Sequence, residues 1–110
     1  MSSNNAISVK LDFGGGAELL CGNTKHHSVD LPQSHAALGV SDSNWTLRQL
    51  ILWVRDTIVR DKPELFVVNG TVRPGILVLV NDTDWELLGC ASYRIQNNDT
   101  ITFISTLHGG

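Results

Sequence analysis

TLRQLILWVRDTI (residues 46–58) is the stretch that decides the fold, because its apolar side chains recur at helical spacing. The recurring residues fall within an arc of about 100° on a helix of 3.6 residues per turn, and they are Leu47, Leu50, Ile51, Val54 and Ile58. Thr46 and Gln49 have the spacing of a capping box, which predicts that the helix begins here. Pro63 disfavours helical backbone before it, so the helix should end by Lys62.

Two apolar residues of this region, Leu52 and Val59, fall outside the arc. Two places suit them: beneath the long polar loop that precedes the helix, or on a surface that contacts a partner. We favour the loop, because exposed apolar pairs are common on proteins and seldom mark an interface.

Upstream of the helix, residues 7–13 alternate between apolar and polar side chains, which predicts a half-buried strand. Gly14-Gly15-Gly16 predicts a turn, and the segment from Ala17 to Cys21 predicts the start of a returning strand. A glycine triplet can also cradle a phosphate, but only when a helix follows it, so we favour the turn. The polar residues 22–45 predict a loop with a short strand from Val29 to Leu31.

Downstream of the helix, short apolar segments alternate with turn residues. Leu65 to Val68 predicts a short strand, and the continuous apolar run from Ile76 to Val80 is typical of a buried central strand. Residues 81–84 predict a turn, and Ile101 to Thr106 predicts the last strand. The order of elements indicates an α+β fold in which one main helix packs on a mixed sheet.

Size and charge restrict the classes of protein to consider. We expect one domain over residues 1–110, with flexible ends over about 1–5 and about 107–110. Eight Lys and Arg stand against eleven Asp and Glu, a net charge of −3, whereas a nucleic-acid binder would have a basic face. The N-terminal sequence lacks the features of a signal peptide, and no apolar run approaches the ~20 residues of a membrane span. We therefore expect a cytoplasmic or nuclear protein, with no direct contact to nucleic acid or membrane.

The histidines and cysteines do not indicate a metal site or a catalytic set. Cys21, His26 and His27 are close in sequence, but no second pair of ligands follows at zinc spacing. We interpret the histidines as solvated loop residues and Cys21 and Cys90 as reduced, small core residues. Asp82 and neighbouring Asp84 resemble part of a calcium loop that lacks its glycine and distal glutamate, so we interpret them as a turn. We expect no cofactor and no metal.

The sequence ends in Gly109-Gly110, and this end has a chemical use. Because glycine has no Cβ, an extended Gly-Gly can thread a narrow channel and present a bare carboxylate. That carboxylate can become an acyl-adenylate, and then a thioester, a thiocarboxylate or an isopeptide. The alternative is a frayed end. His108 could assist proton transfer, but we favour a role as an exposed spacer.

A hairpin, one helix, a further run of strands and a Gly-Gly end together resemble the β-grasp fold of ubiquitin and the bacterial sulfur carriers. Three stretches are similar to the eukaryotic ubiquitin-related modifier family: KPELF (62–66), VRPGILVLVNDTDWELLG (72–89) and FISTLHGG (103–110). The resemblance covers about residues 6–110. Residues 22–44 and the two cysteines depart from the family pattern, so no role is carried over to them.

The resemblance implies that this chain is a substrate of other enzymes and not itself an enzyme. An E1-like activating enzyme with a rhodanese domain would adenylate Gly110 and convert it to a thiocarboxylate. A tRNA thiolase complex would then use the sulfur for 2-thiolation of the wobble uridine of cytosolic tRNAs, and the same end would form isopeptide bonds with target-protein lysines. The resemblance assigns threading and activating-enzyme recognition to Gly109, His108 and Leu107, and we expect a monomer.

Two other classes of function stay open. One is a ubiquitin-like interaction module that is never activated or conjugated, and the other, more distant, is a metal- or thiol-dependent enzyme that would lose activity on mutation of Cys21 or Cys90.

Alternation along the last strand directs Ile101 and Phe103 to one face, which we take as the core, and Ile104 to the other. Ile104 therefore either contacts the activating enzyme near the tail or is covered by another segment of the domain.

Overall fold

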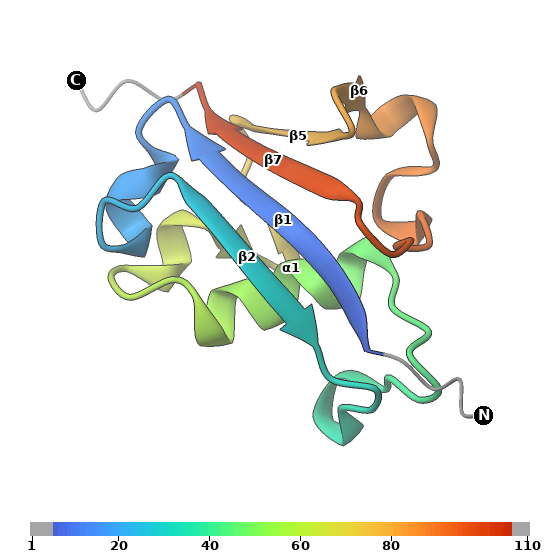
Figure 1. Ribbon diagram of the computed structural model, residues 1–110. Coiled ribbons are helices and arrows are strands. Elements are labelled where there is room, and N and C mark those ends of the chain that lie inside the picture. Colours follow the sequence, from blue (N-terminus) through green and yellow to red (C-terminus); the bar gives the residue numbers. More distant parts are fainter. Residues whose placement is uncertain (1–5, 107–110) are drawn as a thin grey trace.

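The structure is a computed structural model, and it describes residues 6–106. A five-stranded sheet crosses the molecule in the order β2-β1-β7-β5-β6, and the helix α1 (Leu47–Thr57) packs against one of its faces (Figure 1). The strands of this sheet are β1 (Ile7–Gly14), β2 (His26–Leu31), β5 (Ile76–Val80), β6 (Thr83–Asp84) and β7 (Thr100–Ser105). A separate hairpin consists of β3 (Val67–Val68) and β4 (Thr71–Val72). The flexible ends that we predict at 1–5 and 107–110 lie outside the described residues.

The sheet is mixed, as the sequence predicts. β1 pairs antiparallel with β2 on one side and parallel with β7 on the other, where Phe13 stands opposite Phe103. β5 pairs antiparallel with β7, and β6 adds two residues at the outer edge. The first and last strands of the described chain are therefore neighbours at the centre of the sheet.

The helix α1 confirms the predicted start. The Thr46 hydroxyl accepts the Gln49 N–H at 3.4 Å, and the Thr46 N–H donates to the Gln49 side-chain oxygen at 2.8 Å, which is a complete capping box. The helix ends at Thr57, within the limit that Pro63 sets. The predicted apolar arc is buried as far as Val54, and Ile58 packs against the core from just beyond the helix.

The buried surface of α1 is wider than the predicted arc. Leu52 is buried, and Val59 is half-buried against the core, so neither residue forms an exposed partner surface. The reason is that α1 contacts more than the sheet: β3, β4 and two short 3₁₀ helices, Ala36–Leu38 and Cys90–Ser92, also pack against it.

The prediction of a returning strand that starts at Ala17 is wrong. Residues Ala17–Cys21 form a 3₁₀ helix, and the returning strand is β2, which begins at His26. The Glu18 carboxylate accepts the Gly16 N–H at 2.9 Å and holds the start of this helix, while Ala17 and Cys21 point into the core. β2 also extends well beyond the predicted strand at Val29 to Leu31.

Two smaller differences between the predicted and the observed elements also concern the bounds of short segments. The predicted strand from Leu65 to Val68 is a 3₁₀ helix, Pro63–Leu65, followed by the two residues of β3. The last strand is displaced by one residue from the predicted bounds, to Thr100–Ser105. These segments are short, and tertiary packing decides their backbone more than local preference does.

The core lies between α1 and the sheet. Phe13 and Phe103 stack with ring centroids 5.4 Å apart, and Phe66 meets Phe103 edge to face at 5.1 Å. Trp45 is fully buried and donates its indole N–H to the Pro32 carbonyl oxygen at 2.8 Å, which fixes the loop before the helix. Aromatic rings thus form a large part of the core together with the buried aliphatic side chains of the helix.

Leu50 tests this assignment, because its side chain is fully buried at the middle of the helix face. Leu50→Ala should lower the free energy of unfolding by ~2–5 kcal/mol through lost burial and a residual cavity. Chemical denaturation measures the change. Leu87→Ala is the matched control, because Leu87 is 79% exposed and its truncation should change stability by less than ~0.5 kcal/mol. A loss below ~1 kcal/mol for Leu50→Ala would contradict the assignment of the helix face.

Candidate functional site

The predicted site residues Leu107, His108, Gly109 and Gly110 lie outside the described residues, but the structure describes the segment that leads to them. We call Ser105 and Thr106 the tail root. The backbone N–H of Thr106 donates to the Gly75 carbonyl oxygen at 2.8 Å, and the Thr106 hydroxyl donates to the same oxygen at 2.6 Å. The chain is therefore held against the start of β5 for one residue beyond the last strand.

We call the face of the sheet that points away from α1 the outer face. Its apolar part lies beside the tail root. Ile101 and Phe103 are fully buried, while Ile104 points to the opposite face and is half-buried, which confirms the predicted alternation. Leu77 stands opposite Ile104 in the β5–β7 ladder and is 41% exposed. Leu79, half-buried, lies on the same face of β5. We call Leu77, Leu79 and Ile104 the apolar outer patch.

Gly14 leaves the patch open on its other side. It stands opposite Ile104 in the parallel β1–β7 pairing, and an added Cβ would lie 4.0 Å from Ile104 Cγ1. A larger residue at this position would therefore cover part of Ile104. The absence of a side chain at Gly14 contributes directly to the exposure of the patch.

Sequence reasoning identified Ile104 but not Leu77. The run from Ile76 to Val80 is apolar at every position, so its sequence contains no two-residue period that separates one face from the other. In the structure Ile76, Val78 and Val80 are buried, and Leu77 and Leu79 face outward. Since β6 pairs only with the last two residues of β5, the beginning of β5 has no neighbour on that side within the five-stranded sheet.

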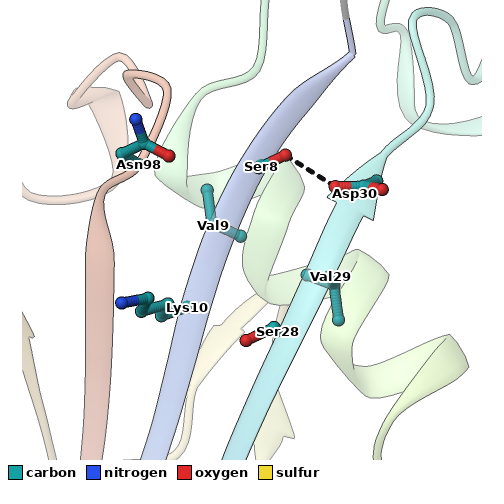
Figure 2. Close-up of a pocket in the computed structure, with 7 residues that line it drawn as sticks. All are labelled: Ser8, Val9, Lys10, Ser28, Val29, Asp30 and Asn98. Atoms are coloured by element: carbon teal, nitrogen blue, oxygen red, sulfur yellow. Dashed lines mark hydrogen bonds between the residues drawn. The ribbon is translucent and has the colours of Figure 1, made fainter.

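The remainder of the outer face is polar. The Asp12 carboxylate lies 2.8 Å from His26 Nδ1, and the Ser8 hydroxyl donates to Asp30 at 2.6 Å. A depression of about 280 Å³ lies here. Figure 2 shows the residues that line it, which are Ser8, Val9, Lys10, Ser28, Val29, Asp30 and Asn98. Because Gly14, not Ser8, pairs with Ile104, the depression lies toward the opposite end of β1 from the tail root.

The residues weighed as metal ligands are used in other ways. Within residues 6–106, no group of three or more His, Cys, Asp or Glu side chains could hold a metal ion. His27 Nε2–H donates to the Thr24 carbonyl oxygen at 3.1 Å, and its ring packs edge to face on Phe13. The Asp84 carboxylate accepts the Glu86 N–H at 2.9 Å and caps a 3₁₀ helix, Trp85–Leu87. The predicted turn at residues 81–84 is therefore confined to Asn81 and Asp82, and Thr83–Asp84 form β6, whose last residue caps the helix.

The two thiols differ in their surroundings. Both are free; Cys21 is buried and Cys90 is half-buried. Burial raises the pKa of the Cys21 thiol to about 11, against the opposing effect of nearby Arg60. Since the thiolate is the nucleophilic form, Cys21 is suited to packing and not to covalent chemistry at neutral pH.

A buried carboxylate organises the loops at the start of β7. Asp99 is 5% exposed and accepts hydrogen bonds from the Tyr93 hydroxyl at 2.7 Å, Asn81 Nδ2 at 2.9 Å and the Gln96 N–H at 2.8 Å. Burial, together with this bond to Asp99, raises the pKa of Tyr93 to about 12. The sequence predicts a turn at Asp99 and no functional role, and its three partners indicate a structural role.

No helix within the described residues is both long and apolar enough to cross a membrane.

Comparison with known proteins gives consistent matches. The family profile "Urm1 (Ubiquitin related modifier)" matches residues 8–110. "Ubiquitin-related modifier 1" of Bos taurus is 49% identical over 104 residues, which are 94% of this chain and 96% of the relative. The solution structure of Urm1 from Trypanosoma brucei has a TM-score of 0.70 and 38% identity, with 100% of both chains covered.

A more distant structure shares the fold. A chain of the BexX/CysO complex of Amycolatopsis orientalis has a TM-score of 0.63 at 20% identity, covering 93% of this chain and 99% of that one. Together with the mixed sheet and single main helix, these matches confirm the β-grasp fold that the sequence predicts.

The thiol environments can be tested by alkylation. In the native protein at neutral pH, iodoacetamide should modify Cys90 faster than Cys21, because Cys21 is buried and its pKa of about 11 leaves little thiolate. The Cys21 rate should rise as the pH approaches 11, since the raised pKa delays deprotonation. Peptide mass spectrometry over a pH series separates the two sites. Faster labelling of Cys21 at neutral pH would contradict the assignment, and the unfolded chain, in which both thiols should react alike, is the control.

Proposed function

The chain belongs to the ubiquitin-related modifier family, and from this membership we propose that it is a ubiquitin-like sulfur carrier activated at the carboxylate of Gly110. An E1-like enzyme with a rhodanese domain adenylates the carboxylate with ATP and releases pyrophosphate. A persulfide of the rhodanese domain then attacks the acyl carbon and AMP leaves. A second enzyme thiol cleaves the resulting acyl disulfide, which leaves the thiocarboxylate on Gly110 and a disulfide on the enzyme.

The anchored tail root is the observation that most directly supports this function. The described chain is held at Thr106 by two hydrogen bonds to Gly75, and four residues with a Gly-Gly end follow. Four extended residues reach about 14 Å at most. In this function the folded domain is the part that another protein binds. The tail then places a short, unhindered acyl group in that protein's active site. All acid–base and nucleophilic chemistry is supplied by that protein.

The acceptors of the activated group follow from its chemistry. We propose that a tRNA thiolase complex takes the sulfur for the wobble uridine of cytosolic tRNAs, and that target-protein lysines attack the same acyl carbon to form isopeptide bonds. The net charge of −3 suits a donor that leaves tRNA recognition to the thiolase. The proposed place of action is the cytoplasm, with the nucleus as a second location.

The apolar outer patch is the proposed docking surface for the activating enzyme. It adjoins the tail root, and an enzyme that holds Gly110 must approach within about 14 Å of Thr106. Leu77 and Ile104 supply an uncharged contact, and the Asp12–His26 contact of the outer face lies farther along β1. Ile104 is proposed as the centre of this surface because it lies nearest to the tail.

The patch would equally serve a ubiquitin-like interaction module that is never activated, which is the second candidate. The two functions differ in what happens to Gly110. Intact mass of the natively expressed protein distinguishes them, since only a carrier acquires the mass of an oxygen-to-sulfur exchange at its C-terminus.

Deletion of Gly110, or its replacement by Leu, should abolish tRNA thiolation and conjugation, because the acyl group is lost or hindered. Thermal unfolding should be unchanged, since the tail follows the last strand. Quantification of 2-thiouridine in a strain that carries only the variant measures the first effect, and immunoblotting for conjugates measures the second. Thiolation that persists in the truncated strain would overturn the proposed function.

Leu77→Asp and Ile104→Asp should raise the apparent KM for adenylation about 10- to 150-fold, because each removes an apolar contact of roughly 1.5–3 kcal/mol. ATP–pyrophosphate exchange with the activating enzyme measures this constant. Leu87→Asp is the control, since Leu87 follows β6, at the end of the sheet away from Ser105. If Ile104→Asp lowers the unfolding temperature sharply, Ile104 serves the core; if adenylation matches the control, docking uses another face.

A further inference from the structure

Two glycine turns enclose the tail root. Figure 1 shows the end of β7 between the loop that follows β1 and the start of β5. On the β5 side, the segment Arg73–Ile76 is a β-turn closed by the Ile76 N–H, which donates to the Arg73 carbonyl oxygen at 3.1 Å. Pro74 and Gly75 occupy the central positions, and Gly75 has φ +101°, which are the residues and the dihedral sign of a type II turn.

This turn directs the Gly75 carbonyl at Thr106. The oxygen accepts both the backbone N–H and the hydroxyl of Thr106, so one residue occupies both of its lone pairs. A side chain at residue 75 would be strained at this φ, and relief of the strain would rotate the carbonyl away from Thr106. Ile76 also pairs with Ser105, so the turn and the tail root belong to one ladder.

On the β1 side, Gly15 lies against the backbone of the tail root. A Cβ at Gly15 would collide with the Ser105 carbonyl oxygen and would lie 3.0 Å from Ile104 Cγ2. Gly15 also has φ +65°, so glycine is required both by conformation and by contact. Gly16 differs in one respect that matters for a test: it has φ +109°, but an added Cβ would meet nothing within 4 Å.

We propose that Gly15, Gly75 and Thr106 form a tail clamp, a set of positioning residues that fix the point and direction in which the tail leaves the domain for activation. The inference rests on the proposed function, since it concerns delivery of Gly110. Its physical reason is the small reach of the tail: four residues span about 14 Å at most, so the place and direction of Thr106 limit where Gly110 can lie. A small misplacement of a reacting group lowers the rate of its reaction steeply.

Substitutions in the tail clamp should lower kcat, whereas substitutions in the apolar outer patch should raise KM. The patch holds the two proteins together whether or not the tail is aligned, whereas the clamp determines how often the bound carboxylate lies in line with ATP. A purely structural role for the three residues would lower the unfolding temperature and leave kcat unchanged at temperatures well below unfolding.

Thr106→Val is the first test, because valine keeps the β-branched shape and the backbone N–H but removes the hydroxyl that bonds to Gly75. We expect kcat for adenylation to fall about 2- to 10-fold, the range of one net hydrogen bond, with KM within about twofold of wild type. Thr106→Ser retains the hydroxyl and should restore kcat. Pyrophosphate exchange at saturating and subsaturating carrier concentrations separates the two constants.

Gly15→Ala is the second test, with Gly16→Ala as its matched control. Both variants place alanine at positive φ in one turn, but only Gly15→Ala pushes on Ser105. We expect Gly15→Ala to lower kcat about 10- to 100-fold relative to Gly16→Ala, with circular dichroism showing that both remain folded. If Gly15→Ala does not fold, the Thr106 pair decides alone.

The outcomes distinguish a failure of the tail clamp from a failure of the proposed function. If wild-type protein supports no pyrophosphate exchange with the activating enzyme, the proposed function fails. If wild type is activated and Thr106→Val equals Thr106→Ser in kcat, or a folded Gly15→Ala equals Gly16→Ala, the tail clamp is wrong and the proposed function stands.

Discussion

The parallel pairing of β1 with β7 is the constraint on which the rest of the structure depends. It brings the first and last strands together at the centre of the sheet, with Phe13 opposite Phe103 and Gly14 opposite Ile104. Parallel neighbours require a crossover, and here nearly the whole chain, α1 included, forms it. The tail root consequently lies at the end of the central strand β7, where Ser105 pairs with Ile76 of β5 and Thr106 leaves the sheet at a defined place.

The two faces of the sheet differ in role: the inner face stabilises the fold, and the outer face is open to contact with other proteins. The inner face buries β1 and β7 side chains against α1, and the stacked phenylalanine rings continue that core to the end of β7. The outer face is polar along β2 and the beginning of β1, and becomes apolar where Gly14 leaves Ile104 and Leu77 uncovered. The apolar outer patch thus adjoins the part of the chain for which a chemical role is proposed.

The limits of sequence reasoning are seen at particular residues. The glycine triplet predicts a turn, which the structure contains, but the segment from Ala17 that follows is a 3₁₀ helix, and the Glu18 carboxylate accepts the Gly16 N–H at its start. The run Ile76–Val80 was recognised as a strand, yet its two faces are indistinguishable in sequence because every residue is apolar. At the candidate site, Ile104 was placed on the correct face by alternation alone, whereas Leu77 required the register of β5 against β7.

Features with local causes follow from the sequence alone: the capping box of Thr46 and Gln49, the alternation of β1 and β7, and membership in a family with a Gly-Gly end. Which glycine contacts the tail root depends on the tertiary structure. Gly15 and Gly16 are adjacent glycines that the sequence alone does not distinguish, and Ser105 lies far from both along the chain. They differ in their surroundings: Gly15 lies against the Ser105 carbonyl, whereas Gly16 faces open space. The cause is the pairing of β1 with β7, which places the glycine turn beside Ser105.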